Sequence, residues 1–362
     1  MRLPREKTKN YTSLSFNARI VKPFKLLLPS FLLSLASTVL AANTTPYEHR
    51  GYEPFETSTS FSRDCARLRQ LGYLPLQESA EGLVFDFSVP RELEDIAHRY
   101  SWNAQNPFFR GALIEFAVVN GVYRPADATS TTIRQALQST LASRDALADP
   151  YPWEWVLVNK NAHNRRKETL RIWLQPHPRT GLQLLQSQGW SSASEQKLGF
   201  VFKTDVNTGV LGATPNGTYP VWYRVPRTSM KGKFPRPVSH AYYVQHLQDT
   251  LSDGSPMVGT FKKHAVQWVP YDDTGILWVS YFHGGDAIHY FARKTYGHPQ
   301  SAGCVEAPLQ AAKAAYKLLH YGVPVSVVSN VSPADLLPAN GLAPTKPQSD
   351  LPSYSISVSS KS

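Results

Sequence analysis

Two residues in the last quarter of the chain could together perform nucleophilic chemistry: Cys304 and His289. A thiol is a weak nucleophile until it loses its proton, and an imidazole within reach can accept that proton. His289 lies in an apolar run typical of a strand, just after a Gly284-Gly285 turn signal. The pattern predicts a cysteine nucleophile with a histidine base.

The small residues before the cysteine have a potential role of their own. Ser301, Ala302 and Gly303 indicate a tight turn whose backbone N–H groups could stabilise the negative oxygen of a tetrahedral intermediate. A helix is expected to begin soon afterwards, at Pro308, and its N-terminus would modestly favour the thiolate. For Ser301, an ordinary turn hydroxyl is an equally good interpretation.

Other interpretations compete at this site. His283 is a rival base, although its place at the turn favours a polar surface role, and His298 precedes Pro299 in an expected loop. A single cysteine is usually a small buried group, which is the role expected of Cys65. The sequence has no His-Glu-x-x-His motif and no paired cysteine spacing, so neither a metal nor any other cofactor is expected.

These residues belong to a stretch, 152–328, whose pattern predicts a mainly β domain with one main helix. The helix is expected over Pro308–Tyr321 and should end at Gly322. Most strands should pair antiparallel. Short β-like runs predict strands at 153–158, 168–174, 197–202, 218–225, 264–269, 275–282, 287–291 and 323–328.

A small helical domain is expected before it, over residues 61–149. Its apolar spacing predicts a first helix that ends near Gly72 and three further helices at 91–100, 107–119 and 131–147. Pro150 and Pro152 then mark the boundary between the two domains.

The first 42 residues have the three-part pattern of an export signal. Residues 1–25 hold seven basic residues and one acidic residue, an uncharged apolar run follows at 26–42, and alanines close it. The run also meets the lower length limit of a membrane span, so an uncleaved anchor is the alternative. Polar residues at 43–60 predict a linker, and the Ser- and Pro-rich residues 329–362 predict a disordered tail.

Composition narrows the class of protein further. The chain has 362 residues, enough for about two domains, and its charged content of 18% is typical of a folded protein. Much of the net charge of +11 comes from the N-terminal basic stretch. Basic residues do not cluster after it, so nucleic-acid binding is not expected.

The region around Cys304 resembles a known family. Ile288-His289, eleven intervening residues and then Ser301–Glu306 are similar to the signature of the L,D-transpeptidase (YkuD) catalytic domain. Asn207–Gly209, Thr214–Pro220 and Gly322–Val325 resemble further strands of that family, so the resemblance covers about 152–328. The segment Leu68–Pro75 looks like part of a peptidoglycan-binding domain.

The resemblance implies a YkuD-like β-sandwich with one main helix and an exported enzyme of the bacterial cell envelope. Its partners would be peptidoglycan stem peptides and glycan, and its role would lie in cell wall biogenesis and cell shape. Cys304 would attack the carbonyl between the third residue, a diamino acid, and the fourth, D-Ala, of a stem tetrapeptide. The side-chain amine of another stem's third residue would then attack the thioester, which gives a 3→3 cross-link. His289 would transfer the protons.

Near this centre, the resemblance implies a substrate mouth. The residues expected to contact substrate there are Tyr290, Arg293, Lys294, His298 and Glu306. Two positions depart from the usual motif, since Ala302 replaces a histidine and Glu306 replaces an Arg or Asn. The first departure leaves the base role to His289 alone.

Three alternatives to this function remain open from the sequence. Water could replace the amine, which would make the protein an L,D-carboxypeptidase. A non-catalytic wall-binding protein could keep the same fold. A cell-wall Cys–His peptidase is a third alternative, although such enzymes place Cys before His and here His289 precedes Cys304.

Overall fold

The computed structural model describes residues 60–80, 82–123, 130–160, 167–175 and 199–329. The expected signal or anchor at 1–42, nearly all of the expected linker and the tail after residue 329 lie outside these residues. Within the described ranges, no helix combines the length and apolar character needed to cross a membrane.

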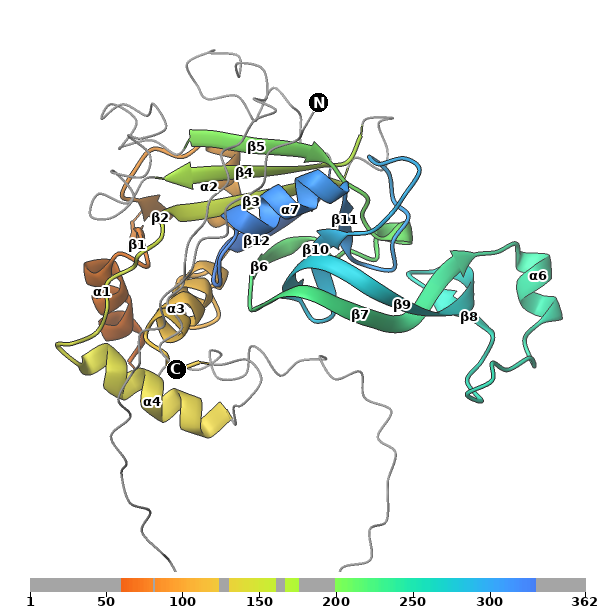
Figure 1. The fold of residues 1–362 in the computed structure, drawn as a ribbon, viewed down its shortest axis with the longest axis horizontal. Helices are drawn as coiled ribbons and strands as arrows, with labels where there is room; N and C mark the ends of the chain where they lie inside the picture. Colours follow the sequence, from red (N-terminus) through yellow and green to blue (C-terminus); the bar gives the residue numbers. More distant parts are fainter. Residues whose placement is uncertain (1–59, 81, 124–129, 161–166, 176–198, 330–362) are drawn as a thin grey trace, which may run out of the picture. The chain divides into compact units, whose positions relative to one another are not determined.

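The first five-stranded sheet has the order β5-β4-β3-β12-β6 (Figure 1). All its neighbours pair antiparallel except β12 and β3, which run parallel. Every residue of β3 is buried, because both faces of this strand are covered, and this explains the apolar run at 155–158. The strands are β3 (Trp153–Lys160), β4 (Thr169–Gln175), β5 (Gly199–Asp205), β6 (Gly217–Pro220) and β12 (Pro324–Ser329).

The second sheet has the order β11-β10-β9-β7, and β8 pairs with β9. Two of its strands are long, and they carry β8 and the short helix α6 (His240–Gln245) at their far end (Figure 1). The strands are β7 (Tyr223–Pro237), β8 (Val258–Phe261), β9 (His264–His283), β10 (Asp286–Tyr290) and β11 (Val305–Ala307).

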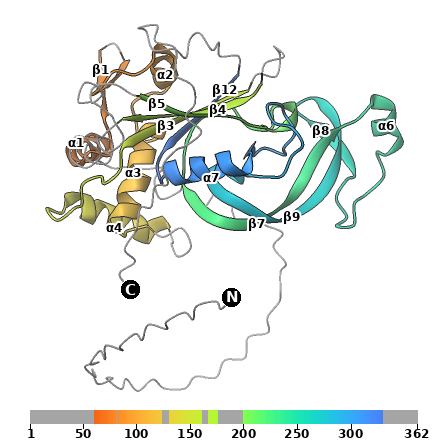
Figure 2. The same cartoon turned by 45° about the horizontal axis from the view of Figure 1, so that its top comes forward.

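The two sheets enclose one hydrophobic core together with helix α7 (Leu309–Leu318), which packs against β9, β10 and β11 (Figure 2). Val156 and Val158 of β3 point into this core, whereas Trp155 and Leu157 point to the opposite face. This alternation is the side-chain period of a strand. The expected β-sandwich with one main helix is confirmed.

The opposite face of the first sheet is covered by the N-terminal segment. Its elements are α1 (Phe61–Leu71), the hairpin β1 (Leu76–Ser79) and β2 (Gly82–Phe85), α2 (Arg91–Ala97), α3 (Pro107–Val119) and α4 (Ser130–Ala142). Their apolar side chains form one cluster with Trp153, Trp155 and Trp173 of the sheet. The segment therefore shares a core with the sheet, and it contains a hairpin that the purely helical prediction lacked.

Local signals account for the helix boundaries in this segment. Gly72 ends α1 in the left-handed conformation at φ 95°, where glycine is favoured. The Asn106 side chain accepts hydrogen bonds from the N–H groups of Phe108 and Phe109, and Pro107 occupies the first turn of α3. Cys65 is buried within α1, as expected.

Several strand predictions are confirmed, and three need correction. β3, β4, β10 and β12 lie where strands were expected. The single strand expected at 218–225 is two strands in different sheets, and those expected at 264–269 and 275–282 are one strand, β9. The helix after Cys304 begins at Leu309, directly after the expected Pro308, and β11, which pairs with β10, separates it from the cysteine. The thiol therefore does not lie at a helix N-terminus.

Candidate active site

The pairing of β10 with β11 brings the histidine and the cysteine together. These two strands run parallel, with Ile288 opposite Val305 and His289 opposite Glu306. Cys304 directly precedes β11, so its side chain lies at the same edge as His289. Fourteen residues lie between His289 and Cys304 in the sequence, and an unpaired loop of that length would not hold the two side chains near each other. The backbone pairing of β10 with β11 does so.

Both side chains line one cavity of about 260 Å³. Its floor comes from β10, β11 and the loop between them, and its other wall comes from the long strands β7 and β9. The lining residues are Met230, Phe234, Tyr271, Asp273, Ile276, His289, Phe291, Arg293, Gln300, Ser301, Ala302, Cys304 and Glu306. The cavity thus combines a thiol, an imidazole, three charged side chains and an apolar wall.

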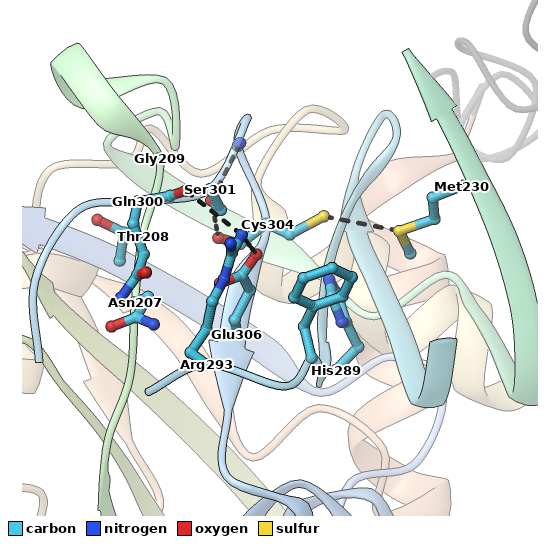
Figure 3. A network of polar contacts seen from close by, with 12 residues as sticks. Asn207, Thr208, Gly209, Met230, His289, Arg293, Gln300, Ser301, Cys304 and Glu306 are labelled. Carbon is cyan, nitrogen blue, oxygen red and sulfur yellow. Dashed lines mark hydrogen bonds and ion pairs between the residues drawn. The ribbon is translucent and has the colours of Figure 1, made fainter. Parts of the chain in front are cut away.

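The Cys304 thiol points to the wall formed by β7. Its sulfur lies 4.0 Å from Met230 Sδ (Figure 3) and 3.9 Å from the Gly285 carbonyl oxygen. Burial raises the pKa of this thiol, and the negative charge of Asp286 raises it further. The thiol is therefore protonated at neutral pH in this arrangement.

The His289 imidazole is neutral and can accept a proton. Only 3% of the residue is exposed, and this burial lowers the pKa of the ring below its usual value. Its Nδ1 lies 3.0 Å from the Tyr290 carbonyl oxygen. A carbonyl only accepts hydrogen bonds, so Nδ1 carries the proton and Nε2 of the neutral ring can accept one.

The turn before Cys304 is held by its own serine. The Ser301 hydroxyl donates to the Cys304 carbonyl oxygen at 2.6 Å and accepts from the Gly303 N–H at 3.2 Å. The Gly303 N–H is thus used within the turn. A Cβ at Gly303 would collide with the Asp286 carboxylate, so a larger residue would require the Asp286 side chain to move.

A second segment, 207–214, braces this turn from the opposite side. The Ser301 N–H donates to the Thr208 carbonyl, and the Thr214 hydroxyl donates to the Gly303 carbonyl at 2.6 Å. A Cβ at Gly209 would lie 2.6 Å from the Thr214 nitrogen, which leaves room only for glycine. These contacts explain what the Asn207–Gly209 motif does in the fold (Figure 3).

The remaining expected site residues divide into two groups. Arg293 and Glu306 both line the cavity, and they form an ion pair with each other. Tyr290, Lys294 and His298 do not line it. Tyr290 packs against the core of the sandwich, while Lys294 and His298 are exposed on the loop.

His283, the rival base, lies at the end of β9 and does not line the cavity. Its Nδ1 lies 3.2 Å from Asp286 Oδ2, and its side chain is 44% exposed. Of the two histidines, only His289 faces the cavity that holds the thiol.

The sequence interpretation missed the wall formed by β7 and β9. Met230, Phe234, Tyr271 and Asp273 come from parts of the chain where no strand was predicted, and the structure places them on β7 and β9. Alternation of side chains along 223–237 and 264–283 is the signal that could have indicated two long strands, but prolines and paired aspartates interrupt it.

Residues 193–327 match the family model of the L,D-transpeptidase catalytic domain, YkuD. This stretch includes every residue that lines the cavity. Residues 193–327 therefore form a YkuD domain. No curated protein matches the chain.

The YkuD domain is also similar to solved structures. An L,D-transpeptidase from Mycobacterium smegmatis is 14% identical with a TM-score of 0.28, and the match covers 48% of this chain and 59% of that one. The catalytic domain of the E. faecium L,D-transpeptidase is 18% identical with a TM-score of 0.27, covering 48% and 95%. An L,D-transpeptidase from Stackebrandtia nassauensis is 15% identical with a TM-score of 0.26, covering 76% and 93%.

Coverage differs among these structures, and the chain spans less than two thirds of the M. smegmatis protein. Likenesses this low carry no information about substrate or mechanism. Among the described residues, no group of three or more His, Cys, Asp and Glu side chains is arranged to hold a metal ion.

Proposed function

We propose that this protein is an exported L,D-transpeptidase that forms 3→3 cross-links between peptidoglycan stem peptides in the cell envelope. The observation that carries the proposal is the cavity that Cys304 and His289 share inside the YkuD domain. The thiol there is protonated and the imidazole is neutral, so the thiol has a proton to give and the imidazole can accept one.

In the first step, the Cys304 sulfur bonds to the carbonyl carbon between the third residue and D-Ala of a donor stem. The thiol proton passes to Nε2 of His289. The C–N bond then breaks, and the imidazolium returns its proton to the amine of the departing D-Ala. The products of this step are a thioester on Cys304 and free D-Ala.

In the second step, the side-chain amine of an acceptor stem attacks the thioester carbon. His289 accepts a proton from the amine as the new C–N bond forms, and it returns this proton to the sulfur as the C–S bond breaks. The enzyme is restored and the two stems are joined. If water attacks instead, the same site acts as an L,D-carboxypeptidase.

The mass of the intact protein tests the first step. The purified protein is incubated with a carbapenem, whose strained amide acylates an activated cysteine, and separately with a stem tetrapeptide. The proposal predicts a mass increase of one adduct in the parent and in the Cys65→Ala control, since Cys65 is buried in α1. The Cys304→Ala variant should show none.

The reaction products then distinguish the acceptors. Cross-linked dimers from the tetrapeptide support transpeptidation, whereas tripeptide alone supports the carboxypeptidase alternative. A folded parent that gains no mass with either reagent would contradict the cysteine mechanism and favour a wall-binding role.

A further inference from the structure

The charges inside the cavity do not balance. Three charged side chains line it, Asp273, Arg293 and Glu306, while His289 is neutral. Arg293 and Glu306 neutralise each other through a two-point ion pair. Asp273 forms no ion pair with any other residue that the structure describes, so the cavity keeps one unmatched negative charge.

The neighbouring residue, Asp272, shows in which direction the Asp273 carboxylate points. Asp272 points to the outer face of β9, where Lys231 of β7 binds it at 2.7 Å. Successive side chains of a strand point to opposite faces, so Asp273 points inward. Asp272 is matched by a cation of this chain, and the inward-facing carboxylate is not.

Asp273 also lies close to the nucleophile. It is opposite Met230 in the pairing of β7 with β9, and Met230 Sδ lies 4.0 Å from Cys304 Sγ. Phe234, Ile276 and Phe291 supply apolar surface to the same cavity, and a charge interaction is stronger in such surroundings than in water. A cation that enters the cavity beside the thiol would therefore meet Asp273.

We propose that Asp273 binds the side-chain ammonium of the diamino acid residue of a stem peptide. This inference rests on the proposed function, in which both substrates carry such a group: the donor on its third residue, and the acceptor as the attacking amine. An acceptor ammonium held there must lose its proton before it attacks the thioester, and His289 is the neutral base in the same cavity.

The test compares Asp273→Asn with Asp272→Asn, a matched control one residue away on the outer face. Each protein is given a tetrapeptide donor whose side-chain amine is either free or acetylated, and thioester formation is followed by intact mass. Cross-linking is measured separately, at increasing concentrations of an amine-bearing acceptor.

We expect Asp273→Asn to raise the apparent KM for the amine-bearing peptide about tenfold, which corresponds to about 1.4 kcal/mol. It should also lose the preference of the parent for the free amine over the acetylated one. Asp272→Asn should behave as the parent, and Asp273→Glu should keep part of the preference because it keeps the charge.

The step that is affected identifies which ammonium is bound. Slower thioester formation with the donor alone places the donor ammonium at Asp273. Normal thioester formation with fewer cross-links and more hydrolysis places the acceptor ammonium there.

Two results would overturn the inference while the proposed function stands: unchanged kinetics in Asp273→Asn, or an equal loss with free and acetylated amines in a variant that unfolds like the parent. If the parent itself forms no thioester, the proposed function fails and this inference fails with it.

Discussion

Arg293 and Glu306 form a two-point ion pair in the cavity that Cys304 and His289 line. Arg293 Nε donates to Glu306 Oε2 and its Nη2 donates to Oε1, both at 2.7 Å (Figure 3). The Glu306 side chain is 5% exposed and that of Arg293 is 28% exposed. Arg293 begins the loop after β10 and Glu306 lies on β11, so the pair joins the two ends of the segment that carries Cys304.

Removing one partner of this pair should destabilise the fold. Arg293→Ala would leave the buried Glu306 carboxylate without its cation, which typically costs about 3 kcal/mol or more. Urea unfolding of the variant should show this as a decrease in the free energy of unfolding. The double variant Arg293→Met, Glu306→Gln should recover part of the loss because no charge remains buried. A decrease below about 1 kcal/mol in the single variant would mean that the pair is weak.

The two histidines should differ strongly in their effect on rate. His289→Ala removes the imidazole that lines the cavity, and the loss of a general base typically slows a reaction by about 10²–10⁴-fold. His283→Ala removes a partly exposed side chain that contacts Asp286 and the Tyr219 ring outside the cavity, so thioester formation should slow far less. The rates are measured by intact mass against time. Similar losses in the two variants would show that His289 is not the base.

The reactivity of Cys304 should follow the shifted pKa values. Burial lowers the pKa of His289, so the ring stays neutral and able to accept a proton down to a pH below 6.5. Thioester formation should therefore be constant through neutral pH and fall only in more acidic solution.

Alkylation of Cys304 by iodoacetamide gives the contrasting measurement. Because burial raises the pKa of the thiol, alkylation should be slow at pH 7 and still rise with pH above 9. Rapid alkylation at pH 6 would instead indicate a thiolate–imidazolium pair in the resting enzyme.

Buried carboxyl groups between α3 and β3 should make stability depend on pH. Glu154 is 2% exposed, and burial raises its pKa from 4.5 to about 8. The folded state therefore binds more protons than the unfolded state between these values. The stability that neutral Glu154 contributes is complete below pH 4.5 and is lost as the pH rises through 8.

Replacing this group should remove part of that dependence. The free energy of unfolding of the parent should decrease between pH 5 and about pH 8, and Glu154→Gln should decrease less because glutamine does not ionise. Urea unfolding at several pH values measures both slopes. The exposed Asp272→Asn serves as the control, and equal slopes in Glu154→Gln and the parent would contradict the assignment.

Much of the β-sandwich could be predicted because its signals are local. The run 153–158 is buried on both faces, and short apolar runs of this kind are typical of covered strands. Helix boundaries at Gly72 and at Asn106–Pro107 also depend on the conformations and hydrogen bonds of single residues. Strand β9 was harder, because no strand was predicted over 270–274, whereas pairing with β7 joins the two expected strands into one.

The sequence by itself indicated which residues could react, Cys304 and His289, because a thiol, an imidazole and a tight turn of small residues are properties of residue type and order. Tertiary structure decided which groups surround them. Glu306, expected to contact substrate, lines the cavity and pairs there with Arg293, and Asp273, from a stretch where no strand was predicted, lines the cavity as well. The reason is physical: burial, charge pairing and pKa depend on atoms brought together from distant parts of the chain, and strand register alone sets which of them meet.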